Sequence, residues 1–590
     1  MTVIASSLTG VLRERAGLQP GDPAFTFIDY ESDWDGVEET LSWAQMYLRV
    51  KNLAVKLREV AAVGDRAVIL APQSMEYVVA FLGAIEAGLI AVPLSTPMVG
   101  AHDDRVNAVL ADAAPTVILT TSAVNETVTP YATSAEGRPA PTVLAVDTLD
   151  LDTRSGGRLK RETPPETAYL QYTSGSTRTP AGVMVSNRNL AVNFEQMMGG
   201  FYPDYNRVPP ADSTVVSWLP FYHDMGLLLG IVAPILGGWH SVLMSPLSFL
   251  ARPARWMRLL GTHTHALTAA PNFAFDLAAA RTTDEDLQGC DFGNVLSIMS
   301  GAERVHEVTV RRYTERFARF NLPPKVIRPS YGLAEATLYV QTRSPGEPPQ
   351  VVHFEPEKLS AGHAERAASG TALISYGAPE SPLVRIVDPD HGTESPAGDI
   401  GEIWVHGENV CAGYWNKPAE TERTFGGRLV NAPADAPAEN WLRTGDLGFM
   451  SEGELFIIGR MKDLLIIRGR NLYPDDIEAS VSVITRGRVA AVAVPDDTTE
   501  KLVVIAEVKD KGLGPAELTE RLETIKGEAA SVISTAHGVA VADIVLVAQG
   551  SIPITTSGKT RRSASLEKYL AGEFTRLDAT ALAGAPAGSR

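Results

Sequence analysis

The sequence predicts an α/β protein with a large, multi-lobed N-terminal domain of layered α/β sheets and a small C-terminal α+β domain. Three features lead to this prediction. Short apolar runs alternate with segments of helical periodicity up to Asp399, as in parallel sheets covered by helices. From Asp399 strand-like segments dominate, and after Arg460 helical and strand-like segments share a small unit. A chain of 590 residues is also long enough for several units with their own cores.

A βαβ unit is the clearest part of the N-terminal series. Residues 67–71 and 89–94 are apolar runs, and residues 74–87 between them carry apolar side chains at helical spacing. A helix is predicted over 186–198, with Ser186 as its N-cap. Further strands are predicted at 116–119, 142–146, 168–172, 215–219, 266–270, 295–299 and 326–328, and further helices at 252–260 and 306–320.

The charged turn 461–463 is expected to separate the two domains. Residues 1–460 would form the large domain and residues 464–577 the small one, with 461–463 as the hinge. The Ala- and Gly-rich tail 578–590 is expected to be disordered. In the C-terminal part, strands are predicted at 402–406, 455–458, 489–494, 502–508 and 544–547, and helices at 475–484 and 515–531.

Charge and cysteine content argue against several classes of protein. The formal net charge is −18 and the chain has no dense run of Lys or Arg, so neither nucleic acid nor a membrane surface is an expected partner. Cys290 and Cys411 lie far apart, with no Cys or His at metal-ligand spacing. We expect them to be thiols of a cytoplasmic protein rather than a zinc site or a disulfide.

One long uncharged stretch could be either a membrane span or a buried part of a soluble fold. Residues 225–251 contain no Asp, Glu, Lys or Arg and are long enough to span a bilayer. Pro234 and Pro246 would interrupt a helix exposed to lipid. We therefore predict a buried helix, a turn and a buried strand, with a membrane span as the less favoured alternative.

The strongest local motif is a small-residue loop between a predicted strand and a predicted helix. Residues 172–182 read Y-T-S-G-S-T-R-T-P-A-G, and their hydroxyl and backbone N–H groups could surround phosphate oxygens. A flexible surface loop is the alternative. The candidate phosphate contacts are Thr173, Ser174, Gly175, Ser176 and Thr177. Residues 557–560, S-G-K-T, are no Walker loop, because Pro553 stands where that pattern needs glycine.

Further motifs follow this loop in a fixed order. They are W-L-P-F-Y-H-D at 218–224, S-G-A-E at 300–303, Y-G-L-A-E at 331–335, R-T-G-D at 443–446, G-R-M-K-D at 459–463 and P-I-T-T-S-G-K at 553–559. Over nearly the whole chain they resemble the adenylate-forming superfamily of acyl-CoA synthetases, luciferases and amino-acid adenylation domains. The loop and A-P-N-F-A-F at 270–275 most resemble long-chain fatty acyl-AMP ligases of the mycobacterial type. This resemblance implies the adenylate-forming fold, a mobile small domain, and ATP and Mg²⁺ as cofactors.

The resemblance also implies a nucleotide site. Tyr331 would stack on adenine, and the base pocket would be lined by Gly301, Ala302, Glu303 and Gly332. The alternative for Tyr331 is an ordinary core tyrosine. The order of the motifs favours the functional interpretation.

Three charged residues would complete that site. Glu335 would ligate Mg²⁺, a hard cation that prefers carboxylate and phosphate oxygens. Asp446 would accept hydrogen bonds from the ribose hydroxyls, and Arg460 would hold the ribose or a phosphate. The alternatives are a solvated helix-start glutamate and a surface ion pair of little energetic value.

Lys559 is the residue to which we assign the central catalytic role. A carboxylate must attack the α-phosphorus of ATP and expel pyrophosphate, so two anions must approach, and a lysine that touches both would stabilise the transition state. His223 resembles the residue near the entrance for the carboxylate, and a core histidine is its alternative. Lys462 would lie at the hinge between the two domains, and a charged turn is its alternative.

The sequence departs from most acyl-CoA synthetases in ways that favour the acyl-AMP ligase branch. Arg178 stands where glycine is usual, Ala181 replaces the loop lysine, and Ala334 replaces a hydroxyl residue. Residues 345–376 look like the insertion of acyl-AMP ligases, which is thought to hinder the domain motion needed for thioester formation with CoA. A surface elaboration without a role is the alternative.

These features predict an enzyme that activates a long-chain fatty acid as its acyl-adenylate and passes the acyl group to the phosphopantetheine of an acyl carrier protein or polyketide synthase in lipid biosynthesis. Residues 225–229, 231–232 and the pair Phe273 and Phe275 could line a tunnel for the alkyl chain, or could only fill the core. A fatty acyl-CoA synthetase is the alternative function. A non-catalytic acyl- or nucleotide-binding relative is the second alternative.

Overall fold

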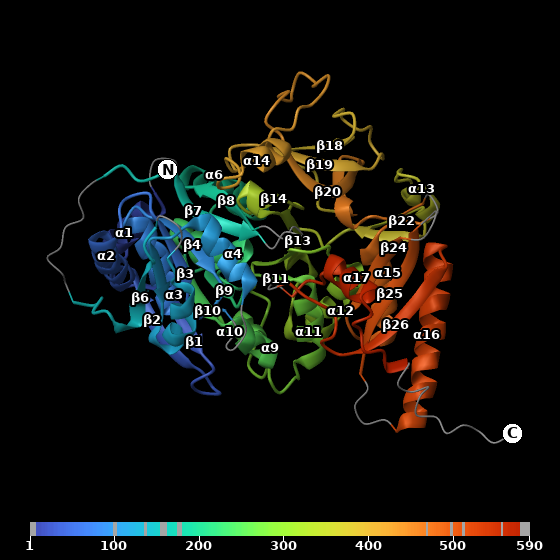
Figure 1. The fold of residues 1–590 in the computed structure, drawn as a ribbon, viewed down its shortest axis with the longest axis horizontal. Helices are drawn as coiled ribbons and strands as arrows, with labels where there is room; N and C mark the ends of the chain where they lie inside the picture. Colours follow the sequence, from blue (N-terminus) through green and yellow to red (C-terminus); the bar gives the residue numbers. More distant parts are fainter. Residues whose placement is uncertain are drawn as a thin grey trace.

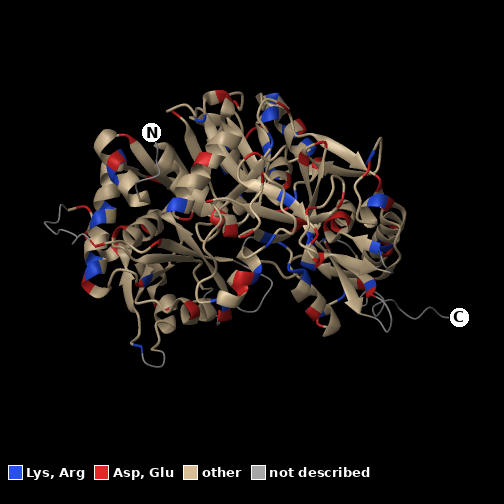
Figure 2. Cartoon of the chain, turned by 90° about the horizontal axis from the view of Figure 1, so that it is seen from above, with Lys and Arg blue, Asp and Glu red and all other residues tan. Residues whose placement is uncertain are grey.

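A computed structural model describes residues 7–97, 103–134, 138–153, 162–173, 180–467, 470–495, 500–509, 514–555 and 558–578. Ser174, Gly175, Ser176 and Thr177 of the predicted phosphate loop lie outside these ranges, as does the predicted tail beyond Asp578. The N-terminal residues lie at one end of the molecule and the C-terminal unit lies at the other (Figure 1). Basic and acidic residues are interspersed over the elements (Figure 2).

The first large sheet has six strands in the order β6-β5-β3-β4-β7-β8. Its strands are β3 (Arg66–Leu70), β4 (Ile90–Leu94), β5 (Val117–Thr120), β6 (Thr142–Ala145), β7 (Thr167–Thr173) and β8 (Ala181–Ser186). All pairs are parallel except β7 with β8. The predicted βαβ unit is confirmed, since helix α3 (Met75–Glu86) connects β3 to β4.

The second large sheet has eight strands in the order β14-β13-β12-β11-β9-β10-β1-β2. Its strands are β1 (Pro23–Asp29), β2 (Val37–Ser42), β9 (Thr214–Ser217), β10 (His240–Met244), β11 (Ala266–Pro271), β12 (Ser297–Gly301), β13 (Ile327–Gly332) and β14 (Tyr339–Thr342). The two edge strands are antiparallel to their neighbours and the central pairs are parallel. The carboxyl ends of β11, β12 and β13 therefore meet at one edge, where α/β proteins bind ligands.

One hydrophobic core joins the two sheets through the helices packed between them. It includes Phe25 of β1, Trp43 of α2 (Trp43–Val60), Ile69 of β3 and Phe81 of α3. Helix α6 (Asn187–Phe201) packs against the same core, and its predicted cap is confirmed because Ser186 and Asn189 form a capping box. Other helices in this part are α1 (Leu8–Leu18), α10 (Ala254–Thr262), α11 (Asn272–Arg281) and α12 (Glu307–Phe317).

The uncharged stretch 225–251 folds as predicted, into buried helix, turn and strand. It forms α7 (Asp224–Leu227), a π-helical turn η6 (Leu228–Val232), α8 (Ala233–Gly237), strand β10 and helix α9 (Pro246–Ala251). Gly238 ends α8 in the left-handed conformation, with φ of 74°. In the part of the chain that the structure describes, every helix is too short or too polar to cross a membrane.

Two smaller sheets follow β14. The antiparallel sheet β18-β19-β20-β21 consists of β18 (Leu383–Val387), β19 (Gly401–His406), β20 (Leu442–Ser451) and β21 (Glu454–Arg460). The predicted insertion 345–376 contains the second sheet, made of β15 (Val351–Phe354), β16 (Arg366–Ala367) and β17 (Thr371–Ile374), with helix α13 (Pro356–Ser360). This insertion is thus a folded layer.

The residues after the turn η10 (Met461–Asp463) build a unit with hydrophobic clusters of its own. Its elements are β22 (Leu465–Ile467), β23 (Arg470–Leu472), α15 (Pro474–Thr485), β24 (Val489–Pro495), β25 (Glu500–Val508), α16 (Pro515–His537), β26 (Val541–Ala548) and α17 (Arg562–Leu570). Helix α16 is longer than the predicted 515–531, because the apolar face continues through Ile533 and only Gly538 ends it in the left-handed conformation.

Candidate active site

The predicted base-pocket residues lie together at the carboxyl edge of the second large sheet. Gly301 ends β12 and Gly332 ends the neighbouring strand β13. Ala302 has a left-handed φ of 65°, which turns the chain away from the sheet before Glu303. A Cβ atom at Gly332 would lie 1.8 Å from the carbonyl oxygen of Leu338, so only glycine fits there.

Tyr331, Asp446 and Arg460 form one polar cluster. The Tyr331 hydroxyl donates to Oδ2 of Asp446 over 2.8 Å, and Nε of Arg460 lies 3.1 Å from Oδ1. Asp446 and Arg460 face each other in the register of β20 and β21, which explains why one carboxylate meets this guanidinium. The Asp446 charge raises the pKa of Arg460, while burial raises the pKa of Tyr331. Both carboxylate oxygens therefore have donors.

Glu402 on β19 shapes the loop that carries Asp446, a role the sequence did not reveal. Its side chain is buried and accepts hydrogen bonds from the Gly445 N–H at 2.9 Å, from Nε of Arg443 at 3.1 Å and from the Trp404 indole at 2.8 Å. The signal was an acidic residue within an otherwise apolar strand, G-E-I-W-V-H. Glu402 thus holds the backbone next to Asp446 in place.

Glu335 lies in the 3₁₀ turn η9 (Ala334–Ala336) and points into a partly buried site. Its Oε1 accepts a hydrogen bond of 2.8 Å from the hydroxyl of Tyr414, another residue that sequence reasoning missed. Burial raises the pKa of Glu335, and the nearby charge of Asp224 raises it further. A bound cation would counteract both effects.

The donor set around Glu335 fits Mg²⁺. Within the described ranges, no group of three or more His, Cys, Asp and Glu side chains converges as a metal cage. Mg²⁺ keeps several waters and commonly takes only one or two protein carboxylates together with substrate phosphates. Glu335 is the carboxylate that would hold such an ion.

His223 precedes α7, and its ring centroid lies 4.8 Å from that of Tyr222. The buried side chain of Gln171 on β7 donates to the carbonyl of Tyr222 over 2.9 Å and so fixes the backbone directly before His223. The next residue, Asp224, has a pKa raised by burial.

Thr173 ends β7 opposite Ala181, so it lies where the predicted phosphate loop begins.

Lys559 comes from the C-terminal unit, but the charges that act on its ammonium group come from residues at this edge of the sheet. Burial and the charge of Arg460 lower its pKa, whereas the carboxylates of Glu303, Asp224 and Asp446 act in the opposite direction. Burial raises the pKa of Glu303. The predicted lysine thus interacts electrostatically with Glu303, which follows β12, with Asp224 of α7 and with Asp446 of β20.

The backbone around Lys559 forms a tight turn. The Thr555 N–H donates to the Lys559 carbonyl over 2.8 Å, and the Lys559 N–H donates to the Thr555 hydroxyl over 3.1 Å. A Cβ atom at Gly558 would lie 3.6 Å from the ring of Phe273. Lys462, by contrast, is exposed in the turn η10.

A small apolar cavity of about 20 Å³, roughly the room that one water molecule needs, lies between helix α6, the turn η6 and strands β9, β11 and β12. Its lining residues are Met197, Met198, Tyr202, Val215, Val216, Ser217, Leu229, Ala233, Trp239, Leu267, Thr268, Ala269 and Met299. Leu229 is the one of these that the sequence proposed for a tunnel. Phe275 instead packs in the core, with its ring centroid 4.9 Å from that of Tyr313.

Residues 12–415 match the profile of the AMP-binding enzyme family. The chain belongs to this family. Two similar relatives come from mycobacteria. The long-chain-fatty-acid–AMP ligase FadD28 of Mycobacterium bovis is 58% identical over 580 residues, which cover 98% of this chain and 100% of the relative. FadD25 of Mycobacterium tuberculosis, provisionally named a fatty-acid–CoA ligase, is 59% identical over 583 residues, with coverage of 98% and 100%.

Solved structures agree with this assignment. The fatty acyl-adenylate ligase of Legionella pneumophila in complex with acyl adenylate and pyrophosphate matches with a TM-score of 0.72 and 33% identity over 96% of both chains. The fatty acid AMP ligase from the same organism matches with a TM-score of 0.71 and 32% identity over 97% of both chains. The predicted adenylate-forming fold is therefore confirmed.

Proposed function

We propose that the protein is a fatty acyl-AMP ligase, which uses ATP and Mg²⁺ to convert a long-chain fatty acid into acyl-adenylate and pyrophosphate. The observation that carries this proposal is that Lys559 of the C-terminal unit interacts electrostatically with Glu303, Asp224 and Asp446, and that its neighbour Gly558 lies close to the ring of Phe273. The similarity to FadD28, named a long-chain-fatty-acid–AMP ligase, supports it.

In the proposed reaction, an oxygen of the fatty acid carboxylate forms a bond to the α-phosphorus of ATP. The bond from that phosphorus to the bridging oxygen breaks, and pyrophosphate leaves with the electron pair. Lys559 reduces the repulsion between the two anions as they approach, and it does so at a partly buried site. Mg²⁺ held by Glu335 would neutralise charge on the phosphates.

The nucleotide would be positioned by the cluster at the sheet edge. Tyr331 offers its ring to adenine beside Gly301, Ala302, Glu303 and Gly332. Asp446 offers carboxylate oxygens to the ribose hydroxyls, and Arg460 lies close enough to hold the ribose or a phosphate. The loop of Thr173, Ser174, Gly175, Ser176 and Thr177 would surround the phosphates. His223 would lie near the carboxylate.

The alkyl chain would enter the small apolar cavity. Three methionines line it, Met197, Met198 and Met299, and their flexible side chains can move apart to admit a chain. The π-helical turn η6 places Leu229 at the wall, and such turns occur often at functional sites. Each buried methylene would contribute up to about 0.8 kcal/mol.

We further propose that the C-terminal unit, residues 464–577, turns about 461–463 after adenylation, with Lys462 as the hinge residue. The folded insertion supports an AMP ligase rather than a CoA synthetase. Its residues Phe354 and Leu359 share a hydrophobic cluster with Phe456 of β21 and with Tyr473 of the C-terminal unit. Rotation would expose these apolar groups to water, so the insertion would resist it.

The acceptor of the acyl group would be the phosphopantetheine of an acyl carrier protein or polyketide synthase, in a lipid biosynthetic pathway of the cytoplasm. The free thiols Cys290 and Cys411 are consistent with a reducing compartment. A fatty acyl-CoA synthetase is the second candidate, because FadD25 is as similar as FadD28 and its name carries that activity.

The test supplies ATP, Mg²⁺ and hexadecanoic acid, and follows products with CoA, with phosphopantetheinylated acyl carrier protein, or with neither. We expect acyl-AMP to accumulate without an acceptor, no acyl-CoA to form, and the carrier to be acylated. Rapid formation of acyl-CoA would favour the second candidate. Absence of pyrophosphate release and of pyrophosphate–ATP exchange with aliphatic acids would refute adenylation.

A further inference from the structure

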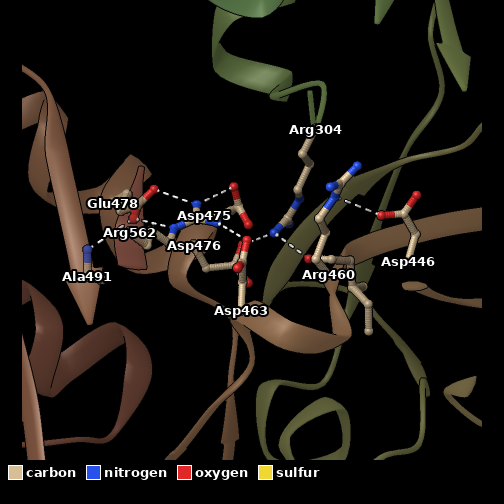
Figure 3. Close-up of polar contacts among 10 residues, drawn as sticks. Arg304, Asp446, Arg460, Asp463, Asp475, Asp476, Glu478, Ala491 and Arg562 are labelled. Carbon is tan, nitrogen blue, oxygen red and sulfur yellow. Dashed lines mark hydrogen bonds and ion pairs between the residues drawn. The ribbon is translucent and has the colours of Figure 1, made fainter. Parts of the chain in front are cut away.

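Arg304 connects the large part of the chain to the C-terminal unit. It follows Glu303 at the base pocket, and its side chain is only 8% exposed. Its Nη1 lies 2.7 Å from Oδ1 of Asp476 in the first turn of α15, and donates to the Ile458 carbonyl of β21 over 3.4 Å. Figure 3 shows the guanidinium reaching across the boundary between the two units. A single buried cation thus contacts elements on both sides of the turn 461–463.

The partner of Arg304, Asp476, is the sequence neighbour of an ion-pair network centred on Arg562. Arg562 of α17 lies 2.9 Å from Asp463 in the turn, 2.8 Å from Asp475 and 2.7 Å from Glu478 (Figure 3). Asp475 is adjacent to Asp476, and both Arg562 and Arg304 lower its pKa against the effect of burial. This network joins the hinge turn, α15 and α17 into one body.

The same body carries Lys559. Arg562 follows Lys559 by three residues, and the Arg561 N–H donates to the Pro553 carbonyl over 2.9 Å, which closes the turn on which Lys559 sits. The position of α15 therefore determines the position of the ammonium group. The ion pair between Arg304 and Asp476 therefore connects the large part of the chain to the unit that carries Lys559.

We propose that Arg304 is a positioning residue for adenylation: its ion pair with Asp476 holds the C-terminal unit, and with it Lys559, over the nucleotide site. Arg304 is fixed beside Glu303, whereas Asp476 moves with α15. Any rotation about 461–463 separates the pair, so it stabilises only the orientation that delivers Lys559. A contact made in one of two orientations shifts the population toward that orientation.

This inference rests on the proposed adenylation, and two measurements keep them distinguishable. The first is pyrophosphate–ATP exchange with hexadecanoic acid. We expect Arg304→Met to lower kcat about tenfold, with KM for ATP changed less than about twofold, because fewer molecules have Lys559 in place. Arg304→Lys should recover part of the loss. Asp476→Asn should have a smaller effect, since the negative charge of Asp475 still acts on Arg304.

A double variant tests whether Arg304 and Asp476 act on each other. Arg304→Met with Asp476→Asn should reduce kcat less than the product of the two single effects. Arg312→Met is the matched control, since Arg312 forms a 2.6 Å ion pair with Asp276 entirely within the large part. This control should leave kcat unchanged. Strictly multiplicative effects, or an equal loss in the control, would refute the proposal.

The second measurement needs no activity. Spin labels at Glu315→Cys on α12 and Val483→Cys on α15, both exposed, report the distance between the two units in a protein with Cys290→Ser. We expect one narrow distribution, which broadens toward other distances in Arg304→Met and stays narrow in Arg312→Met. An unchanged distribution in Arg304→Met would overturn the inference. If the wild-type protein shows no pyrophosphate–ATP exchange but Arg304→Met still broadens the distance distribution, only the proposed function is refuted.

Discussion

The hydroxyl of Tyr331 donates to Oδ2 of Asp446, while Arg460 approaches the other oxygen of the same carboxylate. Each oxygen of Asp446 therefore has one neighbour that orients it, and each keeps a lone pair with which it can accept a further hydrogen bond. A ribose hydroxyl would thus meet a carboxylate that Tyr331 and Arg460 already hold in place.

This relationship makes Asp446 a sensitive position for nucleotide affinity. We expect Asp446→Asn to raise KM for ATP about tenfold or more, because the charge that strengthens its hydrogen bonds is lost. Tyr331→Phe keeps the ring and removes one donor, so its effect should be smaller. Pyrophosphate–ATP exchange at varied ATP measures both. An unchanged KM in Asp446→Asn would remove the residue from the ribose site.

Loss of the Lys559 ammonium should affect the reaction far more than the fold. We expect Lys559→Ala to lower exchange by a factor of about 10² to 10³, since one preorganised charge is missing from the transition state. The thermal midpoint should barely change. Lys56→Ala removes an exposed lysine that pairs with Glu59 and serves as the control. Exchange at the wild-type rate in Lys559→Ala would contradict the mechanism.

The pH dependence of adenylation should report the surroundings of Lys559. Burial and Arg460 lower the pKa of its ammonium, so activity should fall, as pH rises, sooner than for an ordinary lysine. Removing a neighbouring cation stabilises the protonated form of Lys559 and raises its pKa, whereas removing a neighbouring anion lowers that pKa. Arg460→Met should thus move the alkaline limb of kcat to higher pH, and Glu303→Gln should move it to lower pH. Measurements at saturating ATP test the two directions, and shifts of the same sign would disprove this account.

Filling the apolar cavity should shorten the preferred substrate. We expect Ala233→Phe to lower kcat/KM for hexadecanoic acid at least about tenfold, because the ring would fill the small cavity and prevent the methionines from opening it for the distal methylenes. Hexanoic acid, which would not reach that depth, is the internal control. Equal losses for both acids would show that the cavity does not hold the alkyl chain.

The packing of the insertion should control the choice of acceptor. Phe354 is buried in the cluster that includes Tyr473 of the C-terminal unit. Phe354→Ser should weaken this contact, allow rotation and produce measurable acyl-CoA. Glu357→Ser changes an exposed residue of the same segment and should not. Chromatography of the products formed with CoA present compares the two variants with the wild type. Equal formation of acyl-CoA by all three proteins would show that the insertion does not control the choice of acceptor.

Buried strands were readable from the sequence because continuous apolar runs mark them, as with β3, β4 and β11. The strand pair β1 and β2 was not, since β2, V-E-E-T-L-S, is an edge strand with only one buried residue. The π-helical turn η6 also has no distinct sequence pattern.

Site residues with a motif were predicted, whereas their supports were not. Glu402 accepts from the Gly445 N–H beside Asp446, Tyr414 donates to Glu335, and Gln171 donates to the Tyr222 carbonyl, in each case between segments far apart in the chain. No local spacing reveals such a contact. It emerges only when the sheets align their carboxyl ends.

Two glycines near the nucleotide site set different rules for protein engineering. At Gly332 the obstacle is the Leu338 carbonyl, which overlaps any side chain, so a saturation library at this codon should return functional clones with glycine alone. At Gly445 the surroundings are open and only the φ of 70° is demanding, so asparagine should survive selection there.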